Sequence, residues 1–563
     1  MLCFSFSRPW FSSSITHVAR RQLGISSVVQ QVISSEFEID TPKGNVASYI
    51  LENASQWSTH TALECSITGR SYTYSQLVDR VAKFGGVLQK MGIGQGDRVG
   101  VMMLNCLEYP IVFLGTLFIG AVPAVYNSSY TAEEVRNQLV DSGAKLVVGD
   151  EASWGALSVA LHQISRPPIP TILNFDSSSP LPQGHPKLSE LLEDQNIPFA
   201  DAVEVDETEL AFIPYSSGTT GNPKGVKVSH GALASNLEML THPTVSFSRQ
   251  TSGNDQDAHL CYLPFFHIYG INIHMGIGLR YGCRIVVLPR FDSSTYVSNL
   301  FKYKVRVIHT VPTVLNFLMQ SPEVRPDTMT HVEAVLCGAA PVSYTAATTL
   351  TKKIDKHIQF VEAYGMTEAM VTHMTPWGED QLGSCGKCLP SVSTKIIDLQ
   401  DGSLLGPNQQ GELYLKTPSM MSGYDNNDEA TQDNITEDGW VKSGDIGFYN
   451  EDGYFSVIDR SKELIKVKAL QVAPSELEEV LLQHPKVVEA GVVGVPDERL
   501  GEAPRAYVVT SNPATPTEIR EFVDTRVAPY KRLVGGVVFV KEIPKNQTGK
   551  LLRKELRKMA LMG

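Results

Sequence analysis

The run from Tyr215 to Gly225, Tyr-Ser-Ser-Gly-Thr-Thr-Gly-Asn-Pro-Lys-Gly, contains the residue types that bind phosphate. Its glycines permit a tight turn in which backbone N–H groups approach an anion closely. Its hydroxyl groups and the Lys224 ammonium supply further donors for phosphate oxygens. No Gly-Lys-Ser/Thr sequence closes the run, which excludes a Walker P-loop. Composition alone therefore favours a phosphate-binding loop, with a flexible Ser/Thr/Gly loop as the alternative.

Six further segments are similar to the motifs of one enzyme family and occur in the same order along the chain. They are Leu263–Gly270, Cys337–Pro341, Ala363–Glu368, Ser443–Gly447, Asp459–Lys466 and Pro544–Lys550. Together with the phosphate loop, they resemble the motifs of the adenylate-forming superfamily. This superfamily includes acyl-CoA synthetases, 4-coumarate–CoA ligases, beetle luciferases and peptide-synthetase adenylation domains. The resemblance covers roughly residues 45–560 and is closest to the 4-coumarate–CoA ligase and luciferase-like branch.

The resemblance implies an ATP-dependent acid–thiol ligase that acts on a fatty or aryl acid. The acid attacks the α-phosphorus of ATP, pyrophosphate leaves, and the thiol of CoA then displaces AMP from the acyl adenylate. Such chemistry depends on positioning and on stabilising spread negative charge, so Mg²⁺ is expected beside the phosphates. The expected cofactors and partners are ATP, Mg²⁺, CoA and a small-molecule carboxylic acid. Two alternatives stay open: a luciferase-like monooxygenase acting on an acyl adenylate, and a non-catalytic nucleotide-binding homologue.

The resemblance also implies roles for individual residues at the ATP site. Thr367 would bind the α-phosphate, Glu368 the metal ion, and Asp445 the two ribose hydroxyls. Lys550 would neutralise charge at the α-phosphate, a task that suits a mobile ammonium. The expected ATP-binding residues are Ser216, Ser217, Gly218, Thr219, Thr220, Lys224, Gly338, Ala339, Ala340, Tyr364, Gly365, Thr367, Asp445, Arg460 and Lys550.

The acyl pocket is implied beside Leu263–Gly270. His267 and Tyr269 would border this pocket, with His267 as a gate or positioning group; a packed core histidine is the alternative. Nearby Phe265 and Phe266 make the surroundings apolar, which indicates an aryl or medium-length acyl tail rather than acetate. The expected substrate-binding residues are His267, Tyr269, Gly338 and Gln471. The expected catalytic residues are Lys550, Lys466, Thr367 and His267.

In this family, the small C-terminal domain rotates and presents a different face to the active site for each of the two half-reactions. By this analogy, Lys550 is brought in for adenylation, and rotation at a hinge then presents the face around Lys466 and Gln471 for thioester formation. Ala469 departs from the family, which usually has glycine at this position. A methyl group there could impair the CoA step if the glycine permits close backbone approach.

Alternating helical and strand patterns predict how these residues are positioned. Apolar residues recur with a helical period from Tyr72 to Leu88, and Arg98–Met103 has the pattern of a buried strand. The alternation recurs at Ala132–Val148 and Val314–Leu336. This predicts an α/β protein, with a large layered α/β N-terminal domain and a small mobile α+β C-terminal domain. The expected boundaries are 36–458 for the first domain, 459–463 for the hinge and 464–563 for the second.

Within the small domain, Ser475 and Glu478 have the spacing of a capping box. The spacing predicts that Ser475 caps the start of a helix that carries Leu477, Val480 and Leu481. Strands are expected over Val487–Val495, Ala506–Thr510 and Val537–Val540.

The bulk properties limit partners and location. The net charge of −12 argues against nucleic acid as a partner. Tyr109–Tyr126 is long and apolar enough to suggest a membrane span, but its glycines and two prolines favour a buried helix followed by a strand. Oligomeric state is not indicated.

The first 35 residues are Ser-rich, carry Arg8, Arg20 and Arg21, and contain no acidic residue before Glu36. This composition predicts a mitochondrial transit peptide over residues 1–35. A disordered tail on a cytoplasmic protein is the alternative.

Overall fold

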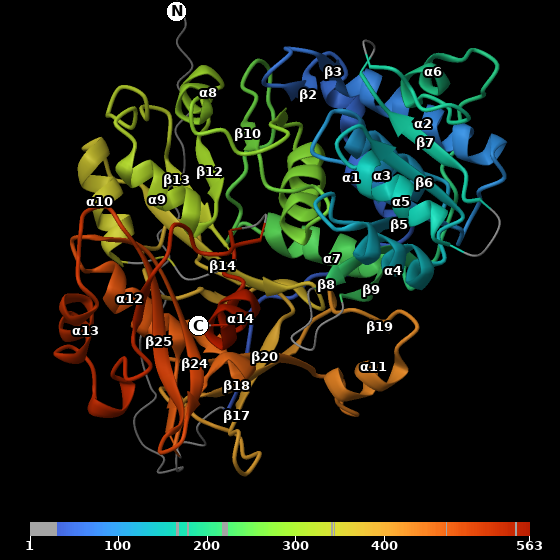
Figure 1. The fold of residues 1–563 in the computed structure, drawn as a ribbon. Coiled ribbons are helices and arrows are strands. Elements are labelled where there is room, and N and C mark those ends of the chain that lie inside the picture. The colour runs from blue at the N-terminus through green and yellow to red at the C-terminus, as the bar shows by residue number, and fades with distance from the viewer. Residues whose placement is uncertain are drawn as a thin grey trace, which may run out of the picture. The chain divides into compact units, whose positions relative to one another are not determined.

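The computed structural model describes residues 31–562, except residues 165–167, 177–178, 217–222, 339–341, 343, 469 and 547–548. Among these residues, the largest sheet has the strand order β19-β9-β8-β5-β4-β6-β7 (Figure 1). Strands β8 to β7 run parallel, whereas β9 and β19 are antiparallel to their neighbours. The strands are β4 (Arg98–Met102), β5 (Val122–Val125), β6 (Leu146–Asp150), β7 (Thr171–Asn174), β8 (Leu210–Ser216), β9 (Lys224–Ser229) and β19 (Gly423–Tyr424).

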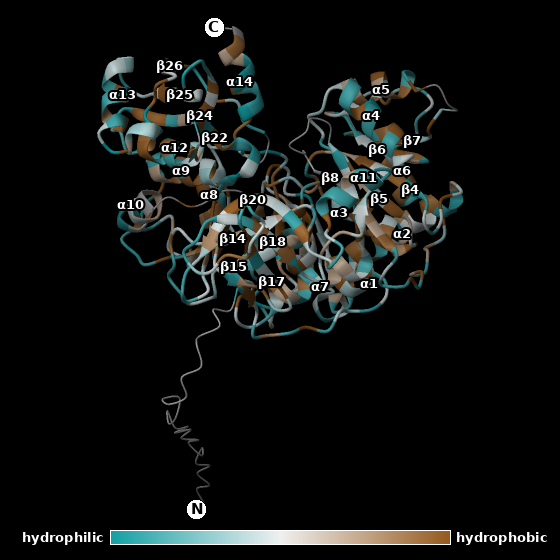
Figure 2. Ribbon diagram, turned by 90° about the horizontal axis from the view of Figure 1, so that it is seen from below, coloured by the Kyte–Doolittle hydropathy of each residue, from teal (hydrophilic) through white to brown (hydrophobic). Residues whose placement is uncertain are grey.

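Helices cover both faces of this sheet because its strands carry apolar residues on each side. In β4, Val99 and Val101 pack in the cluster that contains α2 and α3, whereas Met102 packs in the cluster that contains α4 and α5. Figure 2 shows hydrophobic residues concentrated in the strands and more hydrophilic residues along the helices that cover them. The expected α/β layering is thus confirmed. The helices are α2 (Tyr74–Lys90), α3 (Glu108–Phe118), α4 (Ala132–Ser142) and α5 (Trp154–His162).

The apolar segment Tyr109–Tyr126 forms most of α3 and all of β5, as expected for a buried helix followed by a strand. The side chains of Tyr109, Phe113 and Tyr126 are fully buried. Across the described residues, no helix combines the length and the apolar character that a membrane crossing requires.

Two further sheets meet where β10 lies beside β12. Their strand orders are β10-β11-β2-β3 and β12-β13-β14-β15-β16. Helices α8, α9 and α10 pack on these strands through one apolar cluster, and the π-helix η2 packs against α7. The elements are β2 (Thr61–Cys65), β3 (Ser71–Thr73), β10 (Ala258–Cys261), β11 (Arg284–Val287), β12 (Val307–Thr310), β13 (Ala334–Cys337), β14 (Gln359–Met366), β15 (Met370–Met374), β16 (Lys387–Cys388), α7 (His230–Thr241), η2 (Gly270–Gly278), α8 (Tyr296–Lys302), α9 (Pro312–Gln320) and α10 (Tyr344–Ile354). Short helices α1 (Val46–Leu51), η1 (Ala54–Trp57) and α6 (Leu188–Glu193) complete this part.

A fully antiparallel sheet, with the order β1-β17-β18-β20-β21, was not predicted from the sequence. Its strands are β1 (Val32–Ser34), β17 (Ser393–Ile397), β18 (Gly411–Lys416), β20 (Val441–Tyr449) and β21 (Phe455–Arg460), and helix α11 (Asp428–Asn434) precedes β20. This sheet matters for the site because β20 carries Asp445 and β21 ends at Arg460.

The C-terminal residues form a smaller α+β region on the sheet β23-β22-β25-β24, with β26 beside β25. Helices α12 and α13 pack on one side through Leu477 and Ile519, and α14 packs through Leu556 in a separate cluster with Val493 and Tyr507. The expected smaller C-terminal domain is confirmed, while its mobility and exact boundaries stay predictions. The elements are η3 (Ser461–Glu463), β22 (Ile465–Val467), β23 (Leu470–Val472), α12 (Pro474–Leu482), β24 (Val487–Asp497), β25 (Gly501–Thr510), α13 (Pro516–Asp524), η4 (Pro529–Lys531), β26 (Val537–Phe539) and α14 (Arg553–Met562).

The predicted capping box at Ser475 is wrong. Helix α12 begins at Pro474, and its N-cap residue Ala473 makes no side-chain capping bond. The Ser475 hydroxyl donates instead to the Ile458 carbonyl at 2.7 Å, and its backbone N–H donates to Asp459 Oδ2 at 3.0 Å. Pro474 at the first helical turn supplies the helical φ, so the helix begins without the box. Ser475 is thereby tied to the end of β21.

Candidate active site

The predicted phosphate loop is the connection between β8 and β9. Ser216, at the end of β8, pairs with Lys224 at the start of β9 in antiparallel register. The Ser216 hydroxyl is buried and has no hydrogen-bond partner among the described residues. An unpartnered buried hydroxyl costs about 1–3 kcal/mol, so a ligand with hydrogen-bonding oxygens would be stabilising there. The other predicted loop residues lie outside the described residues: Ser217, Gly218, Thr219 and Thr220.

The ends of this loop are anchored to α4 and to the segment around β19. Tyr215 donates a hydrogen bond to Asp141 Oδ2 at 3.0 Å. The Asp425 backbone N–H donates to the Gly225 carbonyl at 2.7 Å, and the Asp425 carboxylate accepts two hydrogen bonds from the Arg98 guanidinium, at 2.6 and 2.9 Å. A hollow of about 380 Å³ beside the loop is lined by Asp141, Lys224 and Asp425 among others. Lys224 is therefore held at the edge of an open space next to the loop.

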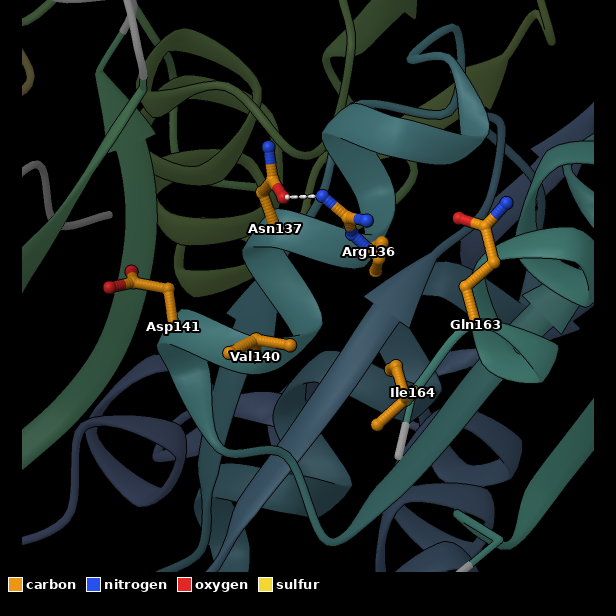
Figure 3. Close-up of a pocket in the computed structure, with 6 residues that line it drawn as sticks. All are labelled: Arg136, Asn137, Val140, Asp141, Gln163 and Ile164. Atoms are coloured by element: carbon orange, nitrogen blue, oxygen red, sulfur yellow. Dashed lines mark hydrogen bonds between the residues drawn. The ribbon is translucent and has the colours of Figure 1, made fainter. Parts of the chain in front are cut away.

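A second hollow lies between α4 and the residues that follow α5 (Figure 3). On α4, Arg136 donates a hydrogen bond to Asn137 Oδ1 at 2.9 Å. Its other lining residues are Val140, Asp141, Gln163 and Ile164. None of these residues was predicted to bind substrate, and this hollow is not the candidate site.

The predicted ribose-binding carboxylate, Asp445, is fixed by two neighbours. Arg460 lies opposite Asp445 in the β20–β21 ladder, and its Nε lies 3.2 Å from Asp445 Oδ1. Tyr364 donates a hydrogen bond to Asp445 Oδ2 at 2.7 Å. Burial raises the pKa of the Tyr364 phenol well above its usual value, and the Asp445 charge adds to this. Tyr364 therefore stays protonated and holds the buried carboxylate in one orientation.

A tight turn after β14 places Thr367 and Glu368. The β14–β15 ladder is irregular between Tyr364 and Gly365, and a Cβ at Gly365 would lie only 2.2 Å from the Met370 carbonyl oxygen. Only glycine fits this close backbone approach. Thr367 and Glu368 follow β14 directly, so this turn fixes where both residues lie relative to Tyr364.

Glu368 is buried and connects to the phosphate loop through Tyr424, a residue that sequence reasoning missed. Tyr424 donates a hydrogen bond to Glu368 Oε1 at 2.9 Å, and the Lys224 ammonium lies 4.9 Å from the centre of the Tyr424 ring. Arg460 is also close enough for the Glu368 charge to raise its pKa. Because the Tyr424 bond uses one carboxylate oxygen, the other fits the role of a hard oxygen ligand for Mg²⁺.

Lys550 lies near Asp445 and Arg460. Its backbone N–H donates to Asn546 Oδ1 at 2.8 Å. Solvent reaches the residue, yet enough protein atoms surround the ammonium to remove much of its hydration. This desolvation lowers the pKa of Lys550 to about 8; the Arg460 charge acts in the same direction and the Asp445 charge opposes it. The ammonium is still mostly charged at neutral pH.

Gly549 allows the Lys550 loop to approach α9. Thr313 donates a hydrogen bond to the Gly549 carbonyl at 3.3 Å. Gly549 has a φ of +76°, and a Cβ there would lie 2.8 Å from Thr313 Oγ1. Both the backbone conformation and the space favour glycine. The residues before it in the loop, Gln547 and Thr548, lie outside the described residues.

His267 lies on the same side of the site as Lys550. Burial lowers the pKa of His267 to about 4, and the Lys550 charge acts in the same direction. Its Nδ1 accepts a hydrogen bond from the backbone N–H of Tyr269 at 3.2 Å. His267 is therefore a neutral imidazole at physiological pH, held by its own loop.

Tyr269 and Gly338 pack against each other. Tyr269 donates a hydrogen bond to the Leu336 carbonyl at 3.3 Å, and a Cβ at Gly338 would lie 3.3 Å from its ring. The structure thus brings together two of the predicted acyl-pocket residues. Ala339 and Ala340, which follow Gly338, lie outside the described residues.

Glu362, which sequence reasoning also missed, supports the strand ends near Gly338. Its carboxyl accepts hydrogen bonds from the backbone N–H groups of Val342, at 3.0 Å, and Gly383, at 2.9 Å. Burial raises the pKa of Glu362 to about 7, and these two bonds oppose the shift. The sequence signal that could have identified Glu362 is an acidic residue within a strand, next to an apolar run.

Lys466 and Gln471 occupy a separate place in the small C-terminal sheet. They lie opposite each other in the β22–β23 ladder and are both exposed. The Lys466 backbone N–H donates to Glu502 Oε2 at 2.8 Å. The structure therefore groups Lys550 with Asp445 and groups Lys466 with Gln471. Ala469, which separates Lys468 from Leu470 in the sequence, lies outside the described residues.

The chain is similar to known enzymes over most of its length. The family model for AMP-binding enzymes matches residues 50–425, and the model for the AMP-binding enzyme C-terminal domain matches residues 476–550. The chain is 34% identical over 524 residues to a 4-coumarate-CoA ligase 1 of Narcissus pseudonarcissus, which covers 91% of this chain and 92% of that protein.

Solved structures share the fold over nearly the whole chain. ATP-bound MatB from Rhodopseudomonas palustris superimposes with a TM-score of 0.82 at 27% identity, covering 92% of this chain and 98% of that chain. A benzoate CoA ligase from Burkholderia xenovorans gives a TM-score of 0.80 at 26% identity, covering 91% and 99%. With the ordered motifs and both family models matched, the chain belongs to the AMP-binding enzymes of the adenylate-forming superfamily.

Proposed function

We propose that this protein is an AMP-forming ligase that joins a carboxylic acid to CoA through an acyl adenylate. The observation that carries the proposal is the grouping of Asp445, Arg460, Glu368 and Lys550 around one position. These residues come from four separate segments of the chain. Membership of the AMP-binding enzymes and the CoA-ligase names of its relatives support the same reaction.

Asp445 would bind the ribose of ATP without losing its protein partners. An ionised carboxylate offers about four acceptor positions, two on each oxygen. Tyr364 uses one position on Oδ2, and Arg460 lies against Oδ1. One position on each oxygen is then left for the two ribose hydroxyls.

The adenylation step would depend on cations placed along the phosphates. Lys224 and the Ser216–Thr220 loop would bind the β- and γ-phosphates, and Thr367 the α-phosphate. Mg²⁺ held by Glu368 would supply charge neutralisation at the phosphate oxygens. Lys550 would donate to the α-phosphate as negative charge develops there during attack by the acid. Pyrophosphate then leaves.

The thioester step would use the hairpin of β22 and β23. Lys466 and Gln471 are exposed on the β22–β23 hairpin, whereas Lys550 lies in the loop that precedes α14. We propose that rotation near residues 459–463 presents this hairpin to the acyl adenylate in place of Lys550. CoA would then attack the acyl carbon and release AMP.

The acid is proposed to carry an aryl or a medium-length fatty tail. Phe266 and Tyr269, on either side of His267 in the chain, are only partly buried. Phe265 and Ile268 are buried in the core, and Tyr269 packs against Gly338. Such an apolar, aromatic surface favours burial of a hydrocarbon tail. The names of the relatives, which are 4-coumarate–CoA ligases, support an aryl acid as the substrate. A fatty acid is the alternative substrate in this proposal.

The purified protein is expected to convert ATP to AMP and pyrophosphate only when a suitable acid is present. The reason is that attack by the carboxylate occurs at the α-phosphorus. A panel of aryl and fatty acids would be screened, with nucleotides and pyrophosphate separated by chromatography. Formation of ADP and inorganic phosphate in the presence of the acid would contradict the proposal.

We also propose that residues 1–35 direct the protein to mitochondria, because they are basic, Ser-rich and free of acids. A fusion of these residues to a fluorescent protein is expected to overlap a mitochondrial dye in cells. The matched control replaces Arg8, Arg20 and Arg21 with glutamine. A diffuse signal from the unmodified fusion would exclude this role.

A further inference from the structure

Three buried histidines meet where two sheets and the π-helix come together. His259 lies on β10, His274 on η2 and His309 on β12. One ring nitrogen of each lies within 4.8 Å of one from the other two. Their ring centres are 4.5 to 5.6 Å apart. None of the three exposes more than 2% of its surface.

Among the described residues, each of the three rings has at least one nitrogen without a hydrogen-bond partner. His259 Nε2 lies 3.1 Å from the Ser248 hydroxyl, and His309 Nδ1 lies 3.5 Å from the Tyr269 hydroxyl. The opposite nitrogens, His259 Nδ1 and His309 Nε2, have no hydrogen-bond partner among the described residues. Neither ring nitrogen of His274 has a hydrogen-bond partner among the residues that the structure describes. Burying such groups without partners costs about 1–3 kcal/mol each, so this arrangement requires an explanation.

We propose that His259, His274 and His309 bind a transition-metal ion, with Zn²⁺ as the best fit. Three imidazole ligands with an open fourth position are a common zinc arrangement. Metal-binding histidines usually donate the N–H of their second nitrogen to a carboxylate, a backbone carbonyl or water, and this bond fixes the ring. Ser248 and Tyr269 are placed to accept such a bond from two of the three rings. Mg²⁺ and Ca²⁺ prefer oxygen ligands and do not fit this set.

The protonation states agree with this donor set. Burial lowers the pKa of His259 to about 4 and the pKa values of His274 and His309 well below their usual range. All three are then neutral at physiological pH, and each offers a lone pair. Only the neutral imidazole is a metal ligand.

The surrounding charges favour the three histidines over a neighbouring set of Asp257, His259 and Cys283. Asp257 accepts a hydrogen bond from Arg306 at 2.8 Å, so its carboxylate is already engaged. The Cys283 thiol donates a weak hydrogen bond to the Arg249 carbonyl at 3.9 Å. The positive charge of Arg306 would repel a bound dication, but the neighbouring Asp257 carboxylate neutralises that charge. A metal ion on the three histidines would join both sheets to η2, directly behind Tyr269.

The test measures metal content of the full-length chain, purified without a metal-chelating tag. The protein is treated with a chelator, dialysed against Zn²⁺ alone, freed of excess metal and analysed by elemental mass spectrometry. About one Zn²⁺ per chain is expected for the wild type and for Cys283→Ser. His274→Leu and His309→Gln should each lose most of it. His230→Asn is the matched control, because His230 is a buried histidine whose Nδ1 accepts a bond from the Val46 N–H.

Two further readouts keep the test independent of folding defects. Co²⁺ in place of Zn²⁺ should give the intense visible absorption of a four-coordinate site in the wild type and in Cys283→Ser. Chelation should lower the melting temperature of the wild type but not that of His274→Leu. A wild-type chain that holds no more metal than His274→Leu, and whose melting temperature is unchanged by chelation, would overturn the proposal. Loss of Zn²⁺ in Cys283→Ser alone would assign the metal to the neighbouring set and would equally overturn it.

Discussion

Lys550→Ala is expected to slow adenylate formation about a hundred- to a thousand-fold. The reason is that the Lys550 ammonium, grouped with Asp445 and Arg460, would stabilise charge developing at the α-phosphate. Loss of one preorganised donor of this kind costs roughly 3–4 kcal/mol. Acid-dependent exchange of labelled pyrophosphate into ATP measures this step. Transfer of the acyl group from preformed acyl adenylate to CoA should stay near the wild-type rate.

Lys466→Ala is the reciprocal change. Lys466 lies on the β22–β23 hairpin opposite Gln471, so its loss should spare pyrophosphate exchange and slow transfer to CoA. Lys545→Ala is the matched control, because Lys545 lies in the same loop as Lys550 and pairs with Glu489 at 2.8 Å. It should change neither half-reaction by more than a small factor. Equal damage to both steps by Lys550→Ala and by Lys466→Ala would rule out a two-face mechanism.

Asp445→Asn should weaken ATP binding more than any other single change at the nucleotide site. The substitution removes an acceptor for the ribose and leaves the Arg460 guanidinium without its carboxylate partner. A hydrogen bond to a charged group contributes about 1.5–3 kcal/mol, so the loss of one ribose bond to the carboxylate should weaken ATP binding by a factor of roughly 10 to 150. Isothermal titration with ATP and the KM for ATP would both measure the loss.

Tyr364→Phe is the control for this prediction. It removes the 2.7 Å hydrogen bond to Asp445 but keeps both the carboxylate and the aromatic ring. Its effect on ATP binding should be clearly smaller than that of Asp445→Asn. If Asp445→Asn binds ATP as the wild type does, Asp445 is not the ribose acceptor.

Local sequence patterns predicted those helices and strands whose formation depends mainly on residues close together in the sequence. The helical period at Tyr72–Leu88 and the apolar run at Arg98–Met103 correspond to α2 and β4. The capping box at Ser475 failed because the Ser475 hydroxyl and backbone N–H bond to residues at the end of β21, which are distant in sequence. A spacing rule has no information about such partners.

The ordered motifs predicted which residues could serve the site but not what supports them. Asp445 and Arg460 were both expected, yet their pairing depends on the register of an antiparallel sheet that no pattern indicated. Tyr424 and Glu362 were missed because their contacts, to Glu368 and to the N–H of Val342, join segments far apart in the chain. Long-range contacts of this kind become visible only in the folded chain.

The central claim, attack of a carboxylate on the α-phosphorus of ATP, is tested most directly by isotope transfer. The acid is labelled with ¹⁸O in its carboxylate, and the nucleotide and phosphate products are analysed by mass spectrometry after reaction with ATP and CoA. Adenylation predicts one ¹⁸O atom in AMP, because the oxygen that bridges carbonyl and phosphorus stays with AMP when CoA attacks the acyl carbon. Label in inorganic phosphate, or AMP without label, would contradict the account.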